Sequence, residues 1–489
     1  MTPSAPQLAL SFTKLPDIMY SRVEPTPVQQ PHVLLLNQPL ALQLGIDEAW
    51  LSSDQALQVL SGCASLAGEG AVATAYTGHQ FGHQNPRLGD GRAHLLGELM
   101  DTDGQRVDVQ LKGSGQTPYS RQGDGRSPLG PVLREYLVSE AMAAMGVPTT
   151  RSLAALASGE YVWRDGGAEP GAILTRIANS HIRVGSFEYA AMQGVECVRQ
   201  LADYTLSRHF SEAKPGALPY LHLLQAVMAK QAQLIAQWMS LGFIHGVMNT
   251  DNMLVCGQTI DYGPCAFMDG YDPRQVYSFI DRQGRYRYDN QPGIGQWNLV
   301  RFAETLLPIM GDERSEAINL AQQALNDYQQ QYEQAYAQRM AAKLGLPSAD
   351  ADLVSELLTI MQAEQLDYTL TFRYLMTQLS SNQTEHSMPQ GVVQASDALL
   401  VWQKKWLAVV SKLGDETQAL NLMAQHNPVF IPRNHCLDAA LKAAYKDDMS
   451  LINELLEATA KPFVYRPQWQ HLAMPPKTKE VIANTFCGT

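Results

Sequence analysis

The sequence predicts an α+β fold in which a β-rich part precedes an α-rich part. The chain has 489 residues, more than one compact core usually needs, so we expect at least two lobes or domains. Short apolar alternations and many glycines occupy the stretch from about residue 72 to 190. Long helical patterns follow from about residue 195.

Residues 1–71 are predicted to form an N-terminal extension. They combine Pro-rich connections with a short helical pattern, ALQLGIDEAWLSSDQALQVLSG (41–62). We expect this extension to pack on the body of the protein.

Residues 72–192 are predicted to form the β-rich lobe. Apolar and polar residues alternate in RVDVQLK (106–112), and YVWR (161–164) and GAILTRIA (171–178) are also strand-like. A helix is expected to start near Pro131, because Leu133, Leu137 and Ala141 form an apolar stripe.

Residues 193–310 are predicted to form the core of a helical lobe, and residues 311–489 a further helical region that includes a terminal Cys. The helical patterns are 218–243, 314–344 and 351–370. Between the first two lies a loop-rich block of roughly 245–297, which holds most of the chemically suggestive residues.

The composition narrows the class of protein. A formal net charge of −12 opposes binding to nucleic acid or to anionic membranes. No stretch approaches the roughly 18 uncharged apolar residues of a membrane span, and the amino terminus lacks a secretion signal. We therefore expect a cytoplasmic protein. Six scattered cysteines without a C-x-x-C pair argue against a disulfide framework or a zinc knuckle.

A glycine motif is the first candidate for chemistry. In RLGDGRAHLLGEL (87–99), Gly89 and Gly91 flank an aspartate and Arg92 follows them. Glycines so spaced let a backbone come close to a phosphate, and an arginine beside them can bind phosphate oxygens bidentately. An ordinary hairpin turn with Asp-Gly at its tip would carry the same residues.

A lysine, a turn and a helical glutamate form the second candidate. Alternation in the strand 106–112 places Lys112 opposite the apolar side chains, where it can reach into a cleft. Glu135 suits the Lys–Glu ion pair that places a lysine on nucleotide phosphates in protein kinases. Between them, Asp124 and Gly125 form a tight turn that could close over a nucleotide. A solvated lysine and a solvated glutamate are the simpler alternative.

Two arginines form the third candidate. Arg176 and Arg183 lie in TRIANSHIRVGSFEY (175–189), across a strand and a turn. Because arginine keeps its charge and offers a planar fork of donors, two of them near a cleft would fit a polyphosphate. Two surface ion pairs are the alternative.

The loop-rich block carries the most specific pattern. HGVMNTDN (245–252) has the outline of the protein-kinase catalytic loop H-R-D-x-x-x-x-N, but its third residue is Val247, which cannot accept a proton. Asn252 and Asp261, the latter in Asp-Tyr-Gly like the kinase D-F-G, are hard oxygen ligands suited to Mg²⁺ or Mn²⁺. The pieces NMLVC (252–256) and QTIDY (258–262) are expected to form a hairpin that brings these two residues together.

With these residues on the page, the chain resembles the selenoprotein O family of protein adenylyltransferases. The resemblance runs through nearly the whole chain and rests on ALQLGID, AYTGHQFG, LGDGRA, QLKGSGQTPYSR, GDGRSPLGPVLREYL, SHIRVGSFEY, HGVMNTDNM and DYGPCAFMD. It implies a protein-kinase-like bilobal fold, with a β-rich N-lobe, a helical C-lobe and extensions at both termini. It also implies ATP bound in the reverse orientation to kinases, so that AMP passes to protein Ser, Thr or Tyr hydroxyls and pyrophosphate leaves.

The resemblance assigns the proton acceptor and the metal ligands. Asp251 matches the family's proton acceptor, and Asn252 and Asp261 match its ligands for Mg²⁺ or Mn²⁺. Because Val247 occupies the position of the kinase base, the base must come from elsewhere, and Asp251 is the nearest carboxylate in the sequence.

The resemblance also assigns the nucleotide contacts. Glu135 would hold Lys112, and Lys112, Arg176 and Arg183 would oppose the charge that grows on the departing pyrophosphate. The implied contacts to ATP are Gly89, Gly91, Arg92, Lys112, Asp124, Gly125, Arg176, Arg183 and Asp261.

Cys487 is a candidate redox residue. Eukaryotic members of the family carry selenocysteine at this position, and some bacterial members pair the Cys with one that follows Asp-Tyr-Gly. Here the segment 270–286 contains no Cys. Cys256 or Cys265 could substitute as the partner in a regulatory disulfide.

Several functions stay open at this point. Besides AMP transfer, Asp251 could serve γ-phosphoryl transfer of the kinase type, and UTP could replace ATP because nothing in the sequence recognises the base. The chain could also be a non-catalytic nucleotide-binding scaffold, although intact Lys112, Glu135 and Asn252 argue against this. The expected partners are ATP and hydroxyl-bearing proteins, without nucleic acid or membrane, and the chain is expected to act as a monomer.

Overall fold

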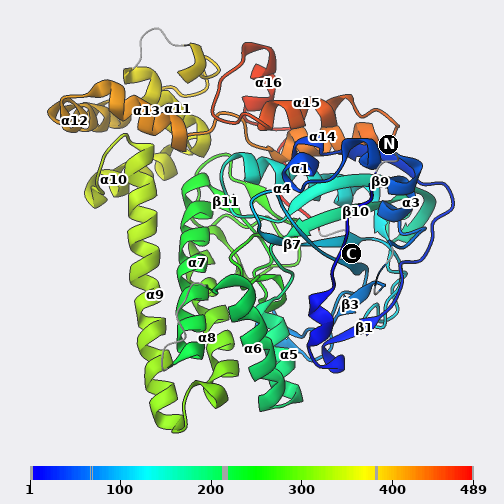
Figure 1. Cartoon of the computed structure of the whole chain (residues 1–489). Helices are drawn as coiled ribbons and strands as arrows, with labels where there is room; N and C mark the ends of the chain where they lie inside the picture. The colour runs from blue at the N-terminus through cyan, green and yellow to red at the C-terminus, as the bar shows by residue number, and fades with distance from the viewer. Residues whose placement is uncertain (1–3, 67, 69, 212–217, 380–383, 487–489) are drawn as a thin grey trace.

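The structure combines an antiparallel sheet in the first half of the chain with helices in the second half (Figure 1). It is a computed structural model that describes residues 4–66, 68, 70–211, 218–379 and 384–486. The predicted α+β class is confirmed. The domain boundaries at residues 71, 192 and 310 stay predictions. Of the helices that the structure describes, none has the length and apolar character needed to cross a membrane.

The sheet is built from strands of the first 178 residues. They are β1 (Tyr20–Arg22), β2 (His32–Leu36), β3 (Val72–Thr74), β6 (Ala93–Met100), β7 (Arg106–Lys112), β9 (Arg151–Arg164) and β10 (Gly167–Ala178). Their order is β1, β3, β6, β7, β10, β9, β2, with antiparallel neighbours throughout, and the short β8 (Ser127–Pro128) pairs with β10. The strand predicted at 106–112 is confirmed, and those at 161–164 and 171–178 are parts of β9 and β10. Two small antiparallel pairs lie apart from this sheet: β4 (Gly78–Gln80) with β5 (His83–Asn85), and β11 (Phe243–Ile244) with β12 (Ala266–Phe267).

The N-terminal segment is built into the sheet more closely than the sequence predicts. It packs on the body as expected, but it also supplies β1 and β2, which lie at opposite ends of the sheet order. The helices α1 (Gln38–Gln43), α2 (Glu48–Leu51) and α3 (Asp54–Leu60) follow. Each begins at a side chain that accepts a hydrogen bond from the first turn, namely Asn37, Asp47 or Ser53.

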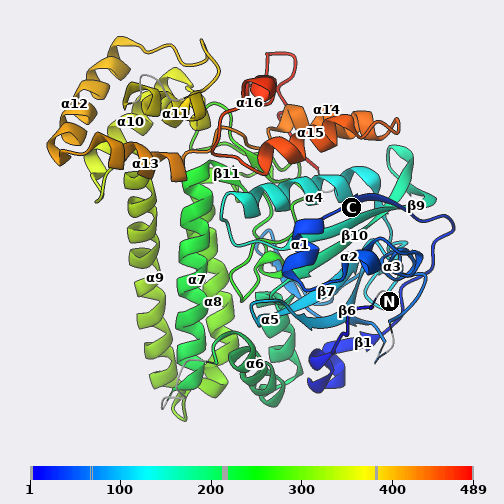
Figure 2. The ribbon, with the colours of Figure 1, turned by 45° about the horizontal axis from the view of Figure 1, so that its top comes forward.

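Helix α4 (Leu129–Ala144) carries Glu135 and packs on β9 and β10. The predicted stripe of Leu133, Leu137 and Ala141 is buried. The helix also contacts α14 (Asn434–Ala444) and α15 (Ser450–Thr459), so segments far apart in the chain lie side by side (Figure 2).

Helices dominate the chain after the sheet. They are α5 (Val184–Gln193), α6 (Val195–His209), α7 (Pro219–Leu241), α8 (Gln291–Met310) and α9 (Arg314–Lys343), followed by α10 (Ala351–Glu364), α11 (Tyr368–Leu379), α12 (Asp397–Leu413), α13 (Glu416–His426) and α16 (Gln470–Ala473). Helix α7 packs against α8 and α9. The helices predicted at 218–243 and 314–344 are confirmed as α7 and α9. Short 3-10 turns span Ser11–Lys14, Asp17–Met19, Thr250–Asn252, Tyr288–Asn290, Thr384–His386 and Pro467–Trp469.

The helical pattern predicted at 351–370 is broken in the structure. Helix α10 ends before Gln365, whose φ of 53° is left-handed. The side chain of Asp367 then accepts a hydrogen bond from the Leu370 amide at 2.8 Å. A left-handed residue followed by a capping carboxylate ends one helix and starts the next, although the apolar period continues.

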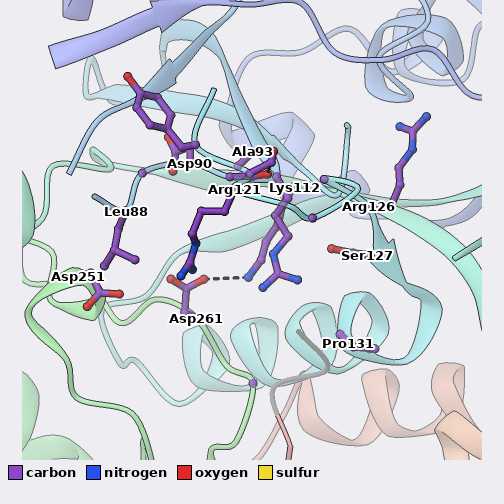
Figure 3. Close-up of a pocket in the computed structure, with 18 of the residues that line it drawn as sticks. Leu88, Asp90, Ala93, Lys112, Arg121, Arg126, Ser127, Pro131, Asp251 and Asp261 are labelled. Carbon is purple, nitrogen blue, oxygen red and sulfur yellow. Dashed lines mark hydrogen bonds and ion pairs between the residues drawn. The ribbon is translucent and has the colours of Figure 1, made fainter. Parts of the chain in front are cut away.

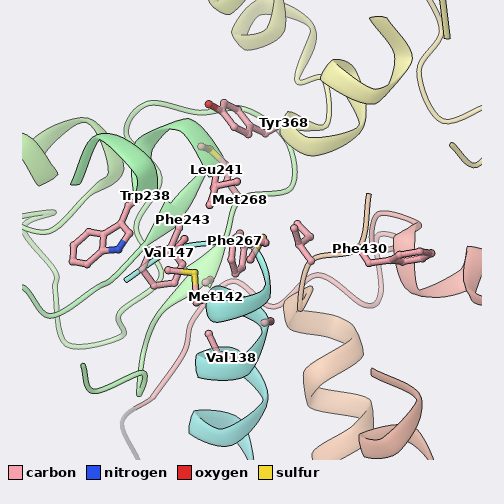
Figure 4. Close-up of a cluster of buried hydrophobic side chains, with 14 of the residues drawn as sticks. Val138, Met142, Val147, Trp238, Leu241, Phe243, Phe267, Met268, Tyr368 and Phe430 are labelled. Atoms are coloured by element: carbon pink, nitrogen blue, oxygen red, sulfur yellow. The ribbon is translucent and has the colours of Figure 1, made fainter. Parts of the chain in front are cut away.

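An apolar cluster joins the sheet to the helical part (Figure 4). Val138 and Met142 of α4 belong to it together with Trp238 of α7 and Phe243 and Phe267 of the β11–β12 pair. The Trp238 and Phe243 ring centroids lie 5.7 Å apart, and those of Phe243 and Phe267 lie 5.3 Å apart. Because the loop-rich block starts at β11, this cluster fixes the block relative to α4 and the sheet.

Candidate nucleotide-binding and active site

A cavity of about 920 Å³ lies between the sheet, α4 and the loops that follow β11 (Figure 3). Its volume falls within the range of small-molecule sites. The predicted nucleotide, metal and catalytic residues of the described chain all line it: Gly89, Gly91, Arg92, Lys112, Asp124, Gly125, Glu135, Arg176, Arg183, Asp251, Asn252 and Asp261. The structure therefore brings these residues together around one space, while their individual roles stay predictions.

Lys112 and Arg176 share two carboxylates in the cavity. Lys112 Nζ donates to Glu135 at 2.5 Å and to Asp261 at 2.8 Å. Arg176 donates to Glu135 at 3.0 Å and to Asp261 at 2.9 Å. The predicted Lys–Glu pair is confirmed, and the alternative of two solvated side chains is wrong because Glu135 is buried.

Arg183 adds a third cation to this cluster. Its guanidinium donates to Asp261 Oδ2 at 2.9 Å and to the Asp251 carbonyl at 2.5 Å, and it lies 4.6 Å from the centre of the Tyr76 ring. Arg176 and Arg183 are only 2% and 3% exposed, which rules out surface ion pairs. Arg183 also lies 3.9 Å from Asp90, so three cations and three carboxylates meet in the cavity. The Nε atom of Arg183 has no hydrogen-bond partner among the described residues.

Asp261 combines a left-handed backbone with a lowered pKa. Its φ of 63° is left-handed, a conformation that costs a non-glycine residue about 1–2 kcal/mol. Burial by itself raises the pKa of this carboxyl, but Lys112, Arg176 and Arg183 together hold the pKa well below its ordinary value. Asp261 is therefore ionised throughout the physiological range.

Asp251 has a different environment in the same cavity. Its Oδ2 accepts a hydrogen bond from Gln80 at 3.0 Å, whereas its buried Oδ1 has no hydrogen-bond partner in the described part of the chain. Burial raises the pKa of Asp251 to about 6, against the lowering effects of Gln80 and Arg183. A carboxylate with a pKa near neutrality and a free oxygen suits a general base.

The β4–β5 hairpin supports Asp251 from the sheet side. The His79 amide donates to Thr250 Oγ1 at 2.7 Å, Thr250 Oγ1 donates to Glu188 at 2.6 Å, and His79 Nδ1 lies 2.5 Å from Glu188. A Cβ at Gly78 would lie 2.3 Å from Asp251 Oδ1, so only glycine allows this approach.

No role for the hairpin is predicted from the sequence. The glycine and glutamine of AYTGHQFG are the only signal, and neither shows that its partner is Asp251, far along the chain.

The hairpin predicted across residues 252–262 is wrong. Leu254 forms a bridge with Arg183, and Thr259 forms one with Thr149, so the two pieces pair with other segments and not with each other. A turn does exist, because the Gly257 amide donates to the Leu254 carbonyl at 3.0 Å. Local alternation cannot reveal partners so distant in the sequence.

The glycines of the first motif lie against another segment of the chain. The sequence predicts instead that they let the backbone come close to a phosphate. A Cβ at Gly89 would lie 2.5 Å from the Tyr119 ring, and one at Gly91 would lie 2.8 Å from the Tyr119 carbonyl oxygen. Gly125 passes equally close to the Gly115 backbone, where a Cβ would lie at 2.1 Å. The glycines thus let the loop 116–125 dock over residues 89–91.

Asp124 pairs with Arg164 at 2.8 Å on this loop. Partial burial opposes the ionisation of Asp124, but the hydrogen bonds from Arg164 and from the Arg126 amide together outweigh it and lower the pKa.

The residues expected to hold a divalent metal offer suitable atoms. The Asn252 amide nitrogen donates to the Val247 carbonyl at 2.9 Å, which leaves its oxygen as the ligand atom. Asp261, the second predicted ligand, offers two carboxylate oxygens, which also accept hydrogen bonds from Lys112, Arg176 and Arg183. Mg²⁺ is usually held by one or two carboxylates together with waters and phosphates. The site therefore fits such an ion, although the described residues include no group of three or more His, Cys, Asp or Glu that could hold a metal.

Arg134 ties α4 to two other segments. It donates to the Gly263 carbonyl at 2.9 Å, to the Cys265 carbonyl at 2.5 Å and to Asn434 Oδ1 of α14 at 3.2 Å. The helix that carries Glu135 is thereby joined to the loop that follows Asp261.

Cys487 lies outside the described residues. Its alternative partners Cys256 and Cys265 are both buried. The tail nearest to Cys487 runs beside the site loop, since Thr485 Oγ1 donates to the Pro264 carbonyl at 2.5 Å. The redox role of Cys487 stays a prediction.

Comparison with known proteins identifies relatives of this chain. Residues 6–460 match the family profile described as "Protein adenylyltransferase SelO". The chain is 48% identical over 485 residues to "Protein nucleotidyltransferase YdiU" of Rhodopseudomonas palustris (strain BisB5). It is 50% identical over 488 and 487 residues to proteins of the same name from Bradyrhizobium sp. (strain BTAi1) and Rhizobium meliloti (strain 1021). Each of these three alignments covers 98% of both chains.

Proposed function

The chain belongs to the SelO family of protein adenylyltransferases, and from this premise we propose that its cavity transfers AMP from ATP to Ser, Thr or Tyr hydroxyls of proteins. The observation that carries the proposal is that two carboxylates of the cavity have different partners and different pKa values. Asp261 is held by three cations, whereas Asp251 keeps a free oxygen and a pKa of about 6. The kinase base position holds Val247, so Asp251 is the group able to take the proton.

The transfer step follows from this arrangement. The acceptor hydroxyl oxygen attacks the α-phosphorus, and the bond from that phosphorus to the oxygen bridging the α and β phosphates breaks. The hydroxyl proton passes to an oxygen of Asp251, and pyrophosphate leaves. Lys112, Arg176 and Arg183 bind the phosphate tail and oppose the charge that develops on it.

Asn252 and Asp261 would hold Mg²⁺ or Mn²⁺, which when bound neutralises phosphate charge. The free oxygen of the Asn252 amide and the hard oxygen character of both side chains support this assignment.

The kinase-like fold of the family also fits this chain. The Lys112–Glu135 pair joins a central strand of the sheet to α4. The loop that carries Asp261 meets this pair, since Lys112 also donates to Asp261 at 2.8 Å (Figure 3). We infer that the sheet with α4 and the helices from α5 onward correspond to the two lobes.

Labelled nucleotides test the proposed reaction. The protein is incubated with a bacterial protein extract and Mg²⁺ or Mn²⁺, with ATP labelled at the α or the γ phosphorus, and in parallel with α-labelled UTP. We expect the α label of ATP to enter protein and the γ label to leave as pyrophosphate. Entry of the γ label alone would show a kinase-type phosphotransferase and overturn the proposal.

Other outcomes separate the remaining alternatives. Preferential labelling from UTP would show UMP transfer. Absence of any label, with nucleotide binding retained, would show a non-catalytic scaffold. Mass spectrometry of the labelled proteins would identify the modified hydroxyls.

A further inference from the structure

We propose that Arg121 is a further nucleotide-binding residue, which the docked loop 116–125 brings into the cavity to bind the phosphates of ATP and of the departing pyrophosphate. This inference rests on the proposed AMP transfer and adds a cation to it. None of the sequence motifs assigns a role to Arg121.

The loop 116–125 is a built structure and not a loose connection. Its stem is closed by a hydrogen bond from the Gly115 amide to the Gly125 carbonyl at 3.0 Å and by a bridge between Ser114 and Arg126. Its tip is held by Thr117 Oγ1, which donates to the Asp90 carbonyl at 2.8 Å.

The same tip is fixed from two further sides. Ser120 Oγ donates to the Gly91 carbonyl, and the Tyr119 hydroxyl lies 3.1 Å from Ser21 Oγ. Because the missing side chains of Gly89 and Gly91 make room for Tyr119, the glycine motif serves to seat this loop.

Arg121 stands at the strained point of the loop. Its φ of 56° is left-handed, a conformation that glycine adopts freely and that other residues rarely adopt. An arginine at such a position indicates that the side chain has a use, since strained residues gather at ligand-binding sites.

The side chain of Arg121 lies where a nucleotide in the cavity could contact it. It lines the cavity and extends from the loop into it, on the side of Asp261 (Figure 3). Arg126, which follows the loop, is turned away (Figure 3) and donates to the Thr26 and Pro27 carbonyls.

The guanidinium of Arg121 is available to bind a ligand. Among the described residues, Arg121 forms no ion pair within 4.0 Å, in contrast to Arg176 and Arg183. Its guanidinium therefore remains able to bind phosphate oxygens from the loop side, while Lys112 and Arg176 reach them from the sheet.

Replacement by glycine separates a binding role from a structural one. In Arg121→Gly the backbone strain is relieved, so the melting temperature should stay unchanged or rise. The loss of one charge-assisted contact should lower kcat/KM for ATP by roughly 10- to 100-fold. Arg121→Lys should retain part of the activity, because lysine keeps the charge and loses the fork. Arg314→Gly, at an exposed position at the start of α9, is the control for loss of a positive charge.

Calorimetric titration with ATP and with pyrophosphate completes the test. Weaker binding of both by Arg121→Gly, with unchanged stability, supports the proposal. Values of kcat/KM and of both dissociation constants within about twofold of the unmodified protein would overturn the proposal. A second result would also overturn it: Arg121→Gly and Arg121→Asn both lower the stability, while the folded fraction of each variant binds ATP and pyrophosphate as before. If the unmodified protein transferred no α label, the proposed reaction would fail, while the titrations would still decide whether Arg121 binds phosphate.

Discussion

Asp251 and Asp261 line the same cavity, but the regions around them differ in charge. Lys112, Arg176 and Arg183 surround Asp261 and lower its pKa, whereas Asp251 has one amide donor, is buried, and has a pKa raised to about 6. Two identical side chains close together in the sequence thus differ in the property that decides their chemistry. The difference teaches that the partners of a carboxyl group, more than its position in a motif, determine whether it anchors cations or accepts a proton.

Replacing Asp251, the carboxylate with one unpaired oxygen, should give the largest effect on the rate of transfer. Asp251→Asn should lower the rate of AMP transfer by roughly 10²- to 10⁴-fold, because the proposed general base is lost. ATP binding should change little, since the side chain of Asp251 makes no ion pair with the cation cluster in the described structure. Rates from α-labelled ATP and titration with ATP check both parts, with the exposed Asp312→Asn as control. A parallel loss of ATP binding would contradict this prediction, because it would show that Asp251 also contributes to nucleotide binding.

Replacing Asp261, the carboxylate paired with three cations, should reduce both the rate of transfer and the free energy of unfolding. Asp261→Asn should lower the rate by roughly 10²- to 10³-fold, because the three cations proposed to bind phosphate lose the carboxylate that they share. The free energy of unfolding should fall by an amount near the lower end of the about 3–5 kcal/mol typical of a broken buried ion pair. The lower end is expected because Glu135 still pairs with Lys112 and Arg176. Urea unfolding without metal or nucleotide measures this, and an unchanged midpoint would contradict it.

The two carboxylates should also differ in the sign of their contribution to stability. The folded pKa of Asp251 lies above the ordinary 3.8, so the fold favours its protonated form and its ionised form is a cost. Asp251→Asn should therefore raise the free energy of unfolding at pH 8 by about 1–3 kcal/mol, and this gain should fade as the pH drops through 6 toward 3.8.

Asp261 has the opposite sign. Its lowered pKa contributes stability above pH 3.8 that is lost as the pH falls below that value. Unfolding curves at pH 5 and pH 8 for both asparagine variants check the contrast, and equal shifts of both variants would refute it.

A smaller effect should follow from changing the one donor to Asp251. Gln80→Leu removes the 3.0 Å hydrogen bond to Oδ2 and should lower kcat by roughly 3- to 15-fold while KM for ATP stays unchanged. Gln84→Leu, on the exposed partner strand β5, is the matched control. An increase in KM would show that Gln80 contacts the nucleotide and does not position Asp251.

The cation cluster was predictable because its residues follow from local patterns. Alternation in the strand 106–112 placed Lys112 on the cleft side, and the position of Glu135 inside the following helix suited the Lys–Glu pair of protein kinases. The two arginines were found from their residue type and spacing alone. The sequence could not tell that they are buried, because burial depends on Tyr76 and Gln110 from other strands and loops.

The surroundings of Asp251 were not predictable in the same way. Gly78 and Gln80 reach it from a hairpin far away in the sequence. The hairpin expected across 252–262 does not form, since Leu254 and Thr259 pair with Arg183 and Thr149. Each miss concerns contacts between distant segments, which neither alternation nor residue spacing reports.

The attachment of α4 through Arg134 has a consequence for regulation. Many protein kinases are turned off when the helix that bears the glutamate swings outward and the lysine is released. Here that swing would have to break the Arg134 contacts to the loop after Asp261 and to α14 at the same time. Release of Lys112 by an outward movement of α4 would therefore cost all three hydrogen bonds of Arg134 as well as the ion pair itself.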